Sequence, residues 1–290
     1  MTTHIVIMAG GVGSRLYPLS TPEHPKQFID LLECGKTLIQ LTYERFLQTD
    51  KDALFWVVTS EKYVHFVKEQ LPSIPDERIL AEPEARNTAP CIAYACRKIR
   101  KRYPDANIVV TPSDAYVPDS EAFSVTMRTA LSFTGSSSGI VCVGITPTSP
   151  HTGYGYINAD AAGENVIAKV KAFKEKPDLQ TAERYLAGGG YFWNAGIFVW
   201  NVRTIEKELR TYAPQIAGIM DRLEPSLYGA GEAAALAELF PQCEKISIDY
   251  AVMEKSSDTY MIPSGWFWSD LGGFEALEQV TGKKFGRNQK

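Results

Sequence analysis

The fold is decided by the stretch His4-Ile-Val-Ile-Met-Ala-Gly-Gly-Val-Gly-Ser-Arg-Leu-Tyr-Pro-Leu-Ser20, which Pro25-Lys26-Gln27-Phe28 follows at once. The apolar run at its start predicts a buried parallel strand that ends at Met8. Three glycines come almost directly after this strand, and glycine permits a sharp turn and a close approach of backbone N–H groups to a ligand. Such a loop is suited to a chain of phosphates, and Arg15 and Lys26 place positive charge beside it.

Two familiar phosphate-binding motifs do not match this loop. A dinucleotide fingerprint requires G-x-G-x-x-G, but the third glycine is replaced by Leu16. A Walker A loop requires G-x-x-x-x-G-K-[ST]; Gly35-Lys36-Thr37 resembles its end, but Asp30 stands where the first glycine should be. We expect Thr37 to cap a helix over Leu38–Gln48 instead.

The composition is that of an ordinary globular protein. Of 290 residues, 44% are hydrophobic and 22% are charged, which suffices for a large core. A net charge of −4 provides no basic field, so we expect no nucleic-acid partner. The five cysteines are odd in number and lack paired C-x-x-C spacing, which favours free thiols over a zinc site. We find no signal peptide and no apolar run that could cross a bilayer, and therefore expect a cytoplasmic protein without a membrane partner.

Strand-like and helix-like runs alternate in the first half of the chain. This alternation predicts βαβ units and a mainly parallel sheet. Loops at the carboxyl ends of the strands should then meet at one edge, including the glycine loop and Pro112-Ser113-Asp114. The strands are expected at Ile5–Met8, Leu54–Thr59 and Ile108–Thr111, and the helices at Leu38–Gln48, Glu61–Gln70 and Thr88–Arg102.

The second half has a different character. Strands are expected at Ile140–Ile145 and Ala168–Phe173, with a loop at Gly153-Tyr154-Gly155-Tyr156 between them. The residues from Val202 to Phe240 read as mostly helical, and Ile262–Trp268 should return to the sheet. A cluster of aromatic residues fits a buried core better than a ligand platform: Tyr191, Phe192, Trp193, Phe198 and Trp200.

The pattern G-G-x-G-x-R-L-x-P-L, with a lysine about ten residues later, resembles the signature of the sugar-1-phosphate nucleotidyltransferases. The tetrapeptide Pro25-Lys26-Gln27-Phe28 resembles the mannose-1-phosphate guanylyltransferase branch of that family. The resemblance implies a Rossmann-like, GT-A-like α/β fold, with a mainly parallel mixed sheet and helices on both faces. It also implies that the loop binds the nucleotide phosphates through Ala9, Gly10, Gly11, Gly13, Ser14, Arg15 and Lys26.

The segment Glu82-Pro83-Glu84-Ala85-Arg86-Asn87-Thr88-Ala89-Pro90 is similar to the family element that contacts the base and ribose. The family usually has glycine where this chain has Ala85. A carboxylate and an amide can pair with a purine through directional hydrogen bonds. The alternative for this segment is that Asn87 or Thr88 merely caps the helix that follows. The resemblance implies nucleotide binding by Glu82, Arg86, Asn87 and Thr88.

Two aspartates are candidates for a metal site. Asp114 in Pro112-Ser113-Asp114 and Asp270 in Trp268-Ser269-Asp270-Leu271-Gly272 resemble the family's Mg²⁺ ligands, and Mg²⁺ prefers hard oxygen donors with substrate phosphates. The family usually has histidine where Ala115 stands. The alternative for Asp114 is a residue that closes a turn. The resemblance implies Mg²⁺ on Asp114 and Asp270, nucleotide contacts from Ser113 and Asp114, and catalytic roles for Arg15, Lys26, Asp114 and Asp270.

The acceptor side is indicated by Phe173-Lys174-Glu175-Lys176-Pro177, which resembles the family's F-x-E-K-P motif. A Lys-Glu-Lys run is by itself most often a solvated surface segment. Its position between a strand and a proline favours the functional interpretation. The resemblance implies that the sugar phosphate is bound by Tyr154, Gly155, Glu175, Lys176, Asn194, Gly196 and Asp249.

The motifs keep the family's order from residue 7 to about residue 274. The resemblance implies one nucleotidyltransferase domain over residues 1–290, with a nucleotide part to about residue 139 and a sugar-phosphate part after it. We expect no C-terminal isomerase or β-helix domain, and the question of whether the protein forms a homodimer stays open. The implied reaction transfers GMP from GTP to a sugar 1-phosphate, with mannose 1-phosphate favoured, and yields a GDP-sugar and pyrophosphate. The alternatives are another acceptor, a thymidylyl- or uridylyltransferase, and a non-catalytic nucleotide-sugar sensor.

Overall fold

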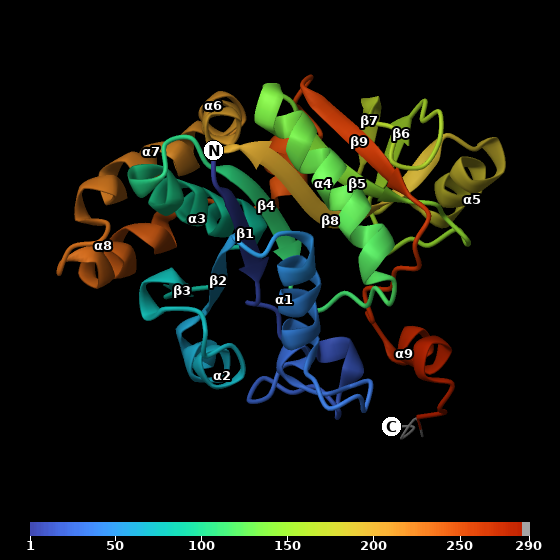
Figure 1. Cartoon of the computed structure of the whole chain (residues 1–290), viewed down its shortest axis with the longest axis horizontal. Coiled ribbons are helices and arrows are strands. Elements are labelled where there is room, and N and C mark those ends of the chain that lie inside the picture. The colour runs from blue at the N-terminus through green and yellow to red at the C-terminus, as the bar shows by residue number, and fades with distance from the viewer. Residues whose placement is uncertain (286–290) are drawn as a thin grey trace.

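The computed structural model describes residues 1–285 and contains one sheet flanked by helices (Figure 1). The sheet has nine strands in the order β3-β2-β1-β4-β8-β5-β9-β7-β6. The strands are β1 (Thr3–Met8), β2 (Leu54–Ser60), β3 (Ile79–Glu82), β4 (Asn107–Pro112), β5 (Ile140–Ile145), β6 (Tyr156–Ala159), β7 (Ala168–Lys174), β8 (Tyr191–Asn201) and β9 (Thr259–Ser264). The helices are α1 (Leu38–Thr49), α2 (Val64–Gln70), α3 (Thr88–Arg102), α4 (Ser120–Ser136), α5 (Leu179–Gly188), α6 (Val202–Tyr212), α7 (Pro214–Leu223), α8 (Glu232–Leu239) and α9 (Phe274–Thr281).

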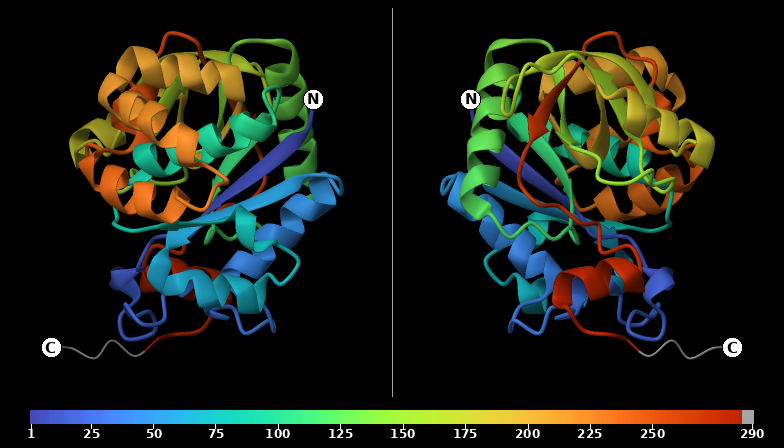
Figure 2. Two further views of the ribbon diagram at one scale, coloured as in Figure 1. Left: turned by 90° about the vertical axis from the view of Figure 1, so that its left-hand side faces the viewer. Right: turned by 90° about the vertical axis from the view of Figure 1, so that its right-hand side faces the viewer.

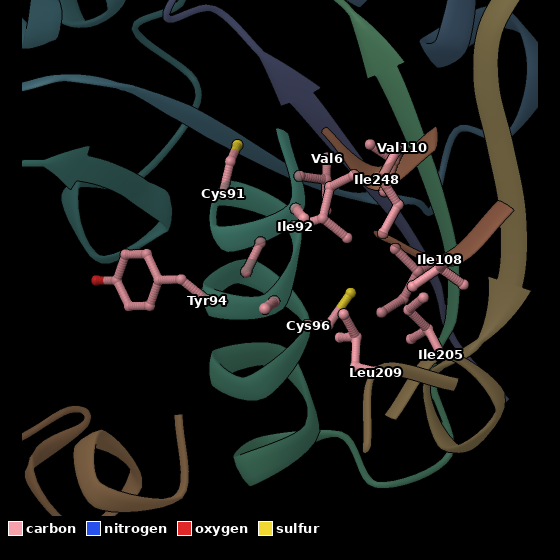
Figure 3. Packing of buried hydrophobic residues seen from close by; sticks show 14 of the residues in the cluster. Val6, Cys91, Ile92, Tyr94, Cys96, Ile108, Val110, Ile205, Leu209 and Ile248 are labelled. Atoms are coloured by element: carbon pink, nitrogen blue, oxygen red, sulfur yellow. The ribbon is translucent and has the colours of Figure 1, made fainter. Parts of the chain in front are cut away.

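Helices cover both faces of the sheet, as Figure 2 shows from two sides. One face buries residues of α3, α6, α7 and α8, and the opposite face buries residues of α1, α2, α4 and α5. On the first face α3 packs against β1, β4 and α6, through Ile92 and Cys96 on the helix and Val6, Ile108 and Leu209 opposite (Figure 3). The expected α/β class with helices on both faces is therefore confirmed.

Parallel pairing brings the ends of neighbouring strands to one edge of the sheet. Met8 of β1 is in register with Val58 of β2 and Pro112 of β4. The backbone N–H of Ser113 donates to the Met8 carbonyl oxygen at 3.2 Å and so ties the two loops together. The expected convergence of the glycine loop and Pro112-Ser113-Asp114 is thus confirmed.

The second half of the sheet is joined to the first by β8. This strand runs antiparallel between β4 and β5, whereas β9 pairs parallel with β5. The strand expected at Ile262–Trp268 instead spans Thr259–Ser264, which is a correction. The reason is that Trp266 leaves the sheet, where its Nε1 donates to Oγ1 of Thr126 on α4 at 3.0 Å. Its apolar surface is buried against a helix and not within a strand.

Two other local expectations are met closely, the cap of α1 and the burial of the aromatic cluster. Thr37 is the N-cap of α1, and its backbone N–H donates to the Gln40 side chain at 2.9 Å. The aromatic cluster lies mostly in the core, with Phe198 and Trp200 fully buried. The five cysteines are all unpaired thiols. Over residues 1–285, the helices are all too short or too polar to traverse a bilayer.

Candidate active site

The glycine loop after β1 is shaped by a side chain that the sequence analysis did not single out. Nε2 of Gln27 donates to the carbonyl oxygens of Ala9 at 3.0 Å and Gly11 at 2.8 Å. Gly13 has a φ of 67°, and a Cβ at this position would lie 2.9 Å from Cγ of Lys26. Glycine is therefore required where the loop turns over Lys26.

Lys26 joins three segments of the chain at one point. Its side chain is 9% exposed, and Nζ lies 3.0 Å from Oδ2 of Asp114. Nζ also donates to the carbonyl oxygens of Asp270 at 2.7 Å and Leu271 at 3.3 Å. A cation fixed in this way stabilises negative charge without first having to be ordered.

Asp270 is oriented by two donors that reach the same oxygen. The Tyr154 hydroxyl donates to Oδ1 at 2.8 Å, and the Gly272 N–H donates to it at 2.9 Å. Burial, with the charge of Asp270, raises the pKa of Tyr154, so the hydroxyl remains a donor at neutral pH. The other oxygen, Oδ2, lies 3.8 Å from Nη2 of the exposed Arg15. Oδ2 is therefore the oxygen available to a ligand.

The carboxylates of Asp114 and Asp270 fit a magnesium ion by their chemistry. Both line one cavity, and both residues contact Lys26. Mg²⁺ commonly takes one or two carboxylates and completes its octahedron with substrate phosphates and water. Within the described part of the chain, no three His, Cys, Asp or Glu side chains are grouped to hold a metal. The two hard oxygen donors suit a metal that shares its ligands with a bound phosphate.

Two cavities meet beside these carboxylates. The first, which we call the β8 cavity, has a volume of about 290 Å³ and is lined by Asn194 and Gly196 of β8 together with Lys26 and Asp270. The second, which we call the glycine-loop cavity, has a volume of about 340 Å³ and is lined by residues including Gly10, Gly11 and Glu82. The two cavities share Met8, Thr88, Pro112 and Asp114.

Glu82 is the buried carboxyl group of the glycine-loop cavity. Its Oε1 atom has no hydrogen-bond partner among residues 1–285. Burial raises the pKa of Glu82 to about 8. A buried polar atom without a partner is rare in folded proteins, so this oxygen is suited to accept a hydrogen bond from a ligand.

The start of α3 is capped by Asn87 and not by Thr88. Asn87 has a φ of 67°, and its Oδ1 accepts a hydrogen bond from the Thr88 N–H at 2.8 Å. Oγ1 of Thr88 instead accepts from the Ile248 N–H at 2.9 Å. Asn87 thus caps the helix and also lines the glycine-loop cavity, while Thr88 ties α3 to the segment that carries Asp249.

The β8 cavity contains a second group of polar side chains. Nδ2 of Asn194 donates to Oδ1 of Asp249 at 3.0 Å, and Oδ1 of Asn194 accepts from the Gly196 N–H at 3.0 Å. Burial, with the nearby charge of Glu175, raises the pKa of Asp249 to about 6. A Cβ on Gly155 would lie 2.5 Å from Oε2 of Glu175, so a larger residue at position 155 would collide with that carboxylate.

Most residues expected to bind a ligand line one of the two cavities. The glycine-loop cavity receives Gly10, Gly11, Glu82, Arg86, Asn87 and Ser113. The β8 cavity receives Arg15, Lys26, Tyr154, Gly155, Glu175, Asn194, Gly196, Asp249 and Asp270, and Thr88 and Asp114 line both. Four expected residues are absent from both linings: Ala9, Gly13, Ser14 and Lys176. Lys176 is instead ion-paired with Glu175.

Sequence reasoning missed some side chains that support the site. The ring of His151 stacks on Tyr154 with 3.8 Å between centroids, and Trp268 packs edge-on against Tyr154 at 5.1 Å. Gln27 and Trp268 lie within the motifs quoted above, and their position there could have indicated a role in the site. No motif contains His151, because its contact with Tyr154 forms only in the folded loop.

The chain is similar to known proteins over almost its whole length. Residues 4–284 match the family model described as nucleotidyl transferase. The xanthan biosynthesis protein XanB of Xanthomonas campestris pv. campestris (strain B100) is 38% identical over 95% of this chain and 59% of that protein. The mannose-1-phosphate guanylyltransferase of Escherichia coli (strain K12) is 36% identical over 95% of this chain and 59% of that protein. The chain thus spans about three fifths of the length of these curated relatives.

A solved structure has the same fold. The crystal structure described as mannose-1-phosphate geranyltransferase from Thermus thermophilus matches with a TM-score of 0.86 and 31% identity, covering 98% of this chain and 80% of that one. UDP-glucose pyrophosphorylase complexed with UDP-glucose matches in fold alone, with a TM-score of 0.62 and 15% identity. On the agreement of family model, sequence and fold, the chain belongs to the nucleotidyl transferase family.

Proposed function

We propose that the chain transfers GMP from GTP to α-D-mannose 1-phosphate and yields GDP-mannose and pyrophosphate. The position of Lys26 carries this proposal. Its Nζ contacts Asp114, which lines both cavities, and the carbonyl oxygen of Asp270. A cation at this junction can contact phosphates that arrive from either cavity. The similarity to the Escherichia coli mannose-1-phosphate guanylyltransferase supports the choice of nucleotide and acceptor.

The proposed reaction needs no covalent enzyme intermediate. An oxygen of the sugar phosphate attacks the α-phosphorus of GTP, a new P–O bond forms, and the bond to the leaving pyrophosphate breaks. Lys26 and Arg15 stabilise the negative charge on these phosphates, and the backbone around Gly10 and Gly11 provides room for them beside β1. Catalysis then consists of positioning and charge stabilisation.

Asp114 and Asp270 would hold Mg²⁺, whose charge neutralises phosphate oxygens when it is bound. Tyr154 and the Gly272 N–H occupy Oδ1 of Asp270, which leaves Oδ2 for this task. Lys26 holds the Asp114 carboxylate through an ion pair of 3.0 Å. Neither carboxylate has to change its protonation state.

Glu82 supports guanine as the base. The ionised carboxylate can accept hydrogen bonds from the ring N–H and the exocyclic amino group of guanine. Thymine and uracil present one N–H between two carbonyl oxygens, which would repel the carboxylate. The position of Glu82 in the lining of the glycine-loop cavity and the unpartnered Oε1 of its carboxyl group support this contact.

The β8 cavity supports a sugar phosphate as the acceptor. Asn194, Asp249 and Glu175 bring an amide and two carboxylates into one cavity, and such groups bind sugar hydroxyls through hydrogen bonds. Lys26 and Arg15 line the same cavity and can pair with the phosphate. A sugar that carries a phosphate matches both the hydrogen-bonding side chains and the two cations of this cavity.

Pyrophosphate release with Mg²⁺ tests the proposal, with GTP, dTTP and UTP each paired with a panel of sugar 1-phosphates. Release with GTP and mannose 1-phosphate alone supports the base, the acceptor and the reaction together. Release with GTP and a different sugar 1-phosphate would support the proposed reaction but contradict mannose 1-phosphate as the acceptor. Release only with dTTP or UTP would contradict the proposed role of Glu82 in binding guanine. Tight GDP-mannose binding without release from any pair would make the chain a nucleotide-sugar sensor.

A further inference from the structure

The loop between β5 and β6 holds the ring of His151 flat against the ring of Tyr154. The two rings are stacked, with 3.8 Å between their centroids and 14° between their planes. Tyr154 lines the β8 cavity, whereas His151 lies outside the linings of both cavities of the site. His151 thus touches a side chain of the site without facing the space that a ligand would fill.

The local chain geometry fixes the His151 ring in this place. Burial lowers the pKa of His151, so the ring is neutral at neutral pH, and its Nδ1 accepts a hydrogen bond from the Gly153 N–H at 3.1 Å. A Cβ on Gly153 would lie 2.8 Å from Cε1 of His151, so a side chain at position 153 would collide with the ring. The backbone N–H of His151 donates to the carbonyl oxygen of Ser149 at 3.0 Å. The ring is therefore held by contacts within its own loop.

Tyr154 is enclosed by three aromatic side chains. His151 covers a face of its ring, and Trp193 and Trp268 pack edge-on at centroid distances of 5.2 and 5.1 Å. A ring packed in this way has little freedom to rotate, so its hydroxyl stays 2.8 Å from Oδ1 of Asp270. The two tryptophans are buried, whereas His151 is half-buried in the same loop as Tyr154.

We infer that His151 is a positioning residue for the metal site, because its ring holds Tyr154 in the orientation in which the hydroxyl fixes Asp270. This inference rests on the Mg²⁺ site that is part of the function proposed above, and it adds a residue that lies outside both cavities. Partners that orient a metal-binding carboxylate change metal affinity without touching the metal.

Titration calorimetry of Mg²⁺ into protein with one equivalent of GTP tests the inference, with GTP alone as the reference. No acceptor is present, so the measurement does not need turnover. His151→Ala should weaken Mg²⁺ binding about three- to tenfold, because the stacked ring is lost. His65→Ala is the matched control, since the exposed His65 ring contacts Phe66 on α2, and it should bind Mg²⁺ as the wild type does.

Two further variants separate the ring of His151 from its nitrogen atoms and from its charge, which faces Asp270 and Arg15. His151→Phe keeps a ring on Tyr154 and should bind Mg²⁺ within about twofold of the wild type. His151→Asn keeps an acceptor for the Gly153 N–H but has no ring, so it should behave like His151→Ala. The reverse pattern, with His151→Asn normal and His151→Phe impaired, would overturn the inference.

A double variant tests whether His151 acts through Tyr154. Tyr154→Phe keeps the stacked ring but lacks the hydroxyl, so His151 then has no hydrogen bond to position. In that background His151→Ala should weaken Mg²⁺ binding by less than about twofold more. A full three- to tenfold loss in both backgrounds would show that His151 acts independently of Tyr154 and would overturn the inference.

The possible results separate this inference from the proposed function. Equal Mg²⁺ affinity in wild type and in a folded His151→Ala, in a protein that transfers GMP, would overturn the positioning role alone; circular dichroism checks the fold. Weaker Mg²⁺ binding in His151→Ala, in a protein that transfers GMP to no acceptor, would count against the proposed function and keep the positioning role. A wild type that binds no Mg²⁺ in the presence of GTP would overturn both.

Discussion

The amino group of Lys26 lies 3.0 Å from Oδ2 of Asp114, at the place where the glycine-loop cavity and the β8 cavity meet. The lysine is nearly buried, and two carbonyl oxygens fix its Nζ before any substrate arrives. A charge that is ordered in advance stabilises the charge of a transition state without a cost of reorganisation. This pair therefore marks the centre of the proposed chemistry.

Lys26→Ala should lower kcat about 10²- to 10³-fold, because it removes the fixed cation that faces the phosphates. Initial rates of pyrophosphate release measure the loss, and circular dichroism checks that the fold is kept. Lys36→Ala is the matched control, since Lys36 pairs with Glu44 on the surface and should leave kcat unchanged within about twofold. Near-normal turnover of a folded Lys26→Ala protein would refute the role of this lysine.

Tyr154→Phe should weaken Mg²⁺ binding about 10- to 100-fold, because the hydroxyl that orients Asp270 is removed while the ring is kept. The dependence of the rate on Mg²⁺ concentration, and calorimetry with Mg²⁺ and GTP, measure this change. Saturating Mg²⁺ should restore most of the turnover. Tyr43→Phe, which loses only a surface contact with Ser73, is the control. An unchanged Mg²⁺ requirement in Tyr154→Phe would show that the hydrogen bond does not position the carboxylate.

The affinity for GTP should rise with pH up to about pH 8 and then level off. Burial raises the pKa of Glu82 to about 8, and the form that accepts hydrogen bonds from guanine is the ionised one. Below that pH a proton must leave when GTP binds, so affinity should fall by as much as about tenfold per pH unit. Calorimetry from pH 6 to 9 measures this, and buffers of different ionisation enthalpy count the released proton.

Comparison of wild type with Glu82→Gln separates the pH dependence caused by Glu82 from that caused by the titration of GTP itself. The variant should bind GTP about 10- to 100-fold more weakly above pH 8 and should lack the part of the pH dependence that Glu82 causes. Glu77→Gln, at an exposed carboxylate paired with Arg102, serves as the control. Identical pH profiles for wild type and Glu82→Gln would count against base recognition by Glu82.

His4 should make the free energy of unfolding depend on pH. Burial, with the charge of Arg78, lowers the pKa of His4 from 6.5 to about 4, and Nδ1 accepts a hydrogen bond from Nε1 of Trp56 at 3.0 Å. The unfolded chain binds this proton more readily, so the stabilisation is complete above about pH 6.5 and is lost as the pH falls towards 4. The loss from this one group is about 3 kcal/mol.

Urea unfolding of wild type and His4→Asn between pH 4 and 8 measures the contribution of His4. An Asn side chain offers an acceptor in a similar place but does not titrate, so its unfolding free energy should fall less with acid. His65→Asn, at an exposed histidine on α2, should behave like wild type. Parallel pH profiles for wild type and His4→Asn would contradict this prediction.

Local sequence patterns predicted part of the structure. The helix α3 has the predicted bounds Thr88–Arg102, because its start and its apolar stripe are both encoded within the segment. The meeting of the two loops after β1 and β4 followed from the rule for parallel strands. The place of β8 between β4 and β5 did not follow from any local pattern, because it depends on pairing between distant segments.

The same distinction applies to the candidate site. Lys26, Asp114 and Asp270 could be named from motifs, since each stands in a short recognisable string. The hydrogen bond from Tyr154 to Asp270 could not, because its partners lie 116 residues apart and meet only in the folded protein. The burial of Glu82 beside Gly10 likewise appears only once β3 is packed beside the glycine loop.

The central claim, direct transfer of GMP to a sugar phosphate, is tested most directly with GTP that carries a radioactive α-phosphate. We predict that wild-type protein with Mg²⁺ and mannose 1-phosphate moves the label into GDP-mannose and releases an equal amount of unlabelled pyrophosphate. Label that appears only in free GMP, or GTP that stays intact in the presence of every sugar 1-phosphate offered, would contradict the account.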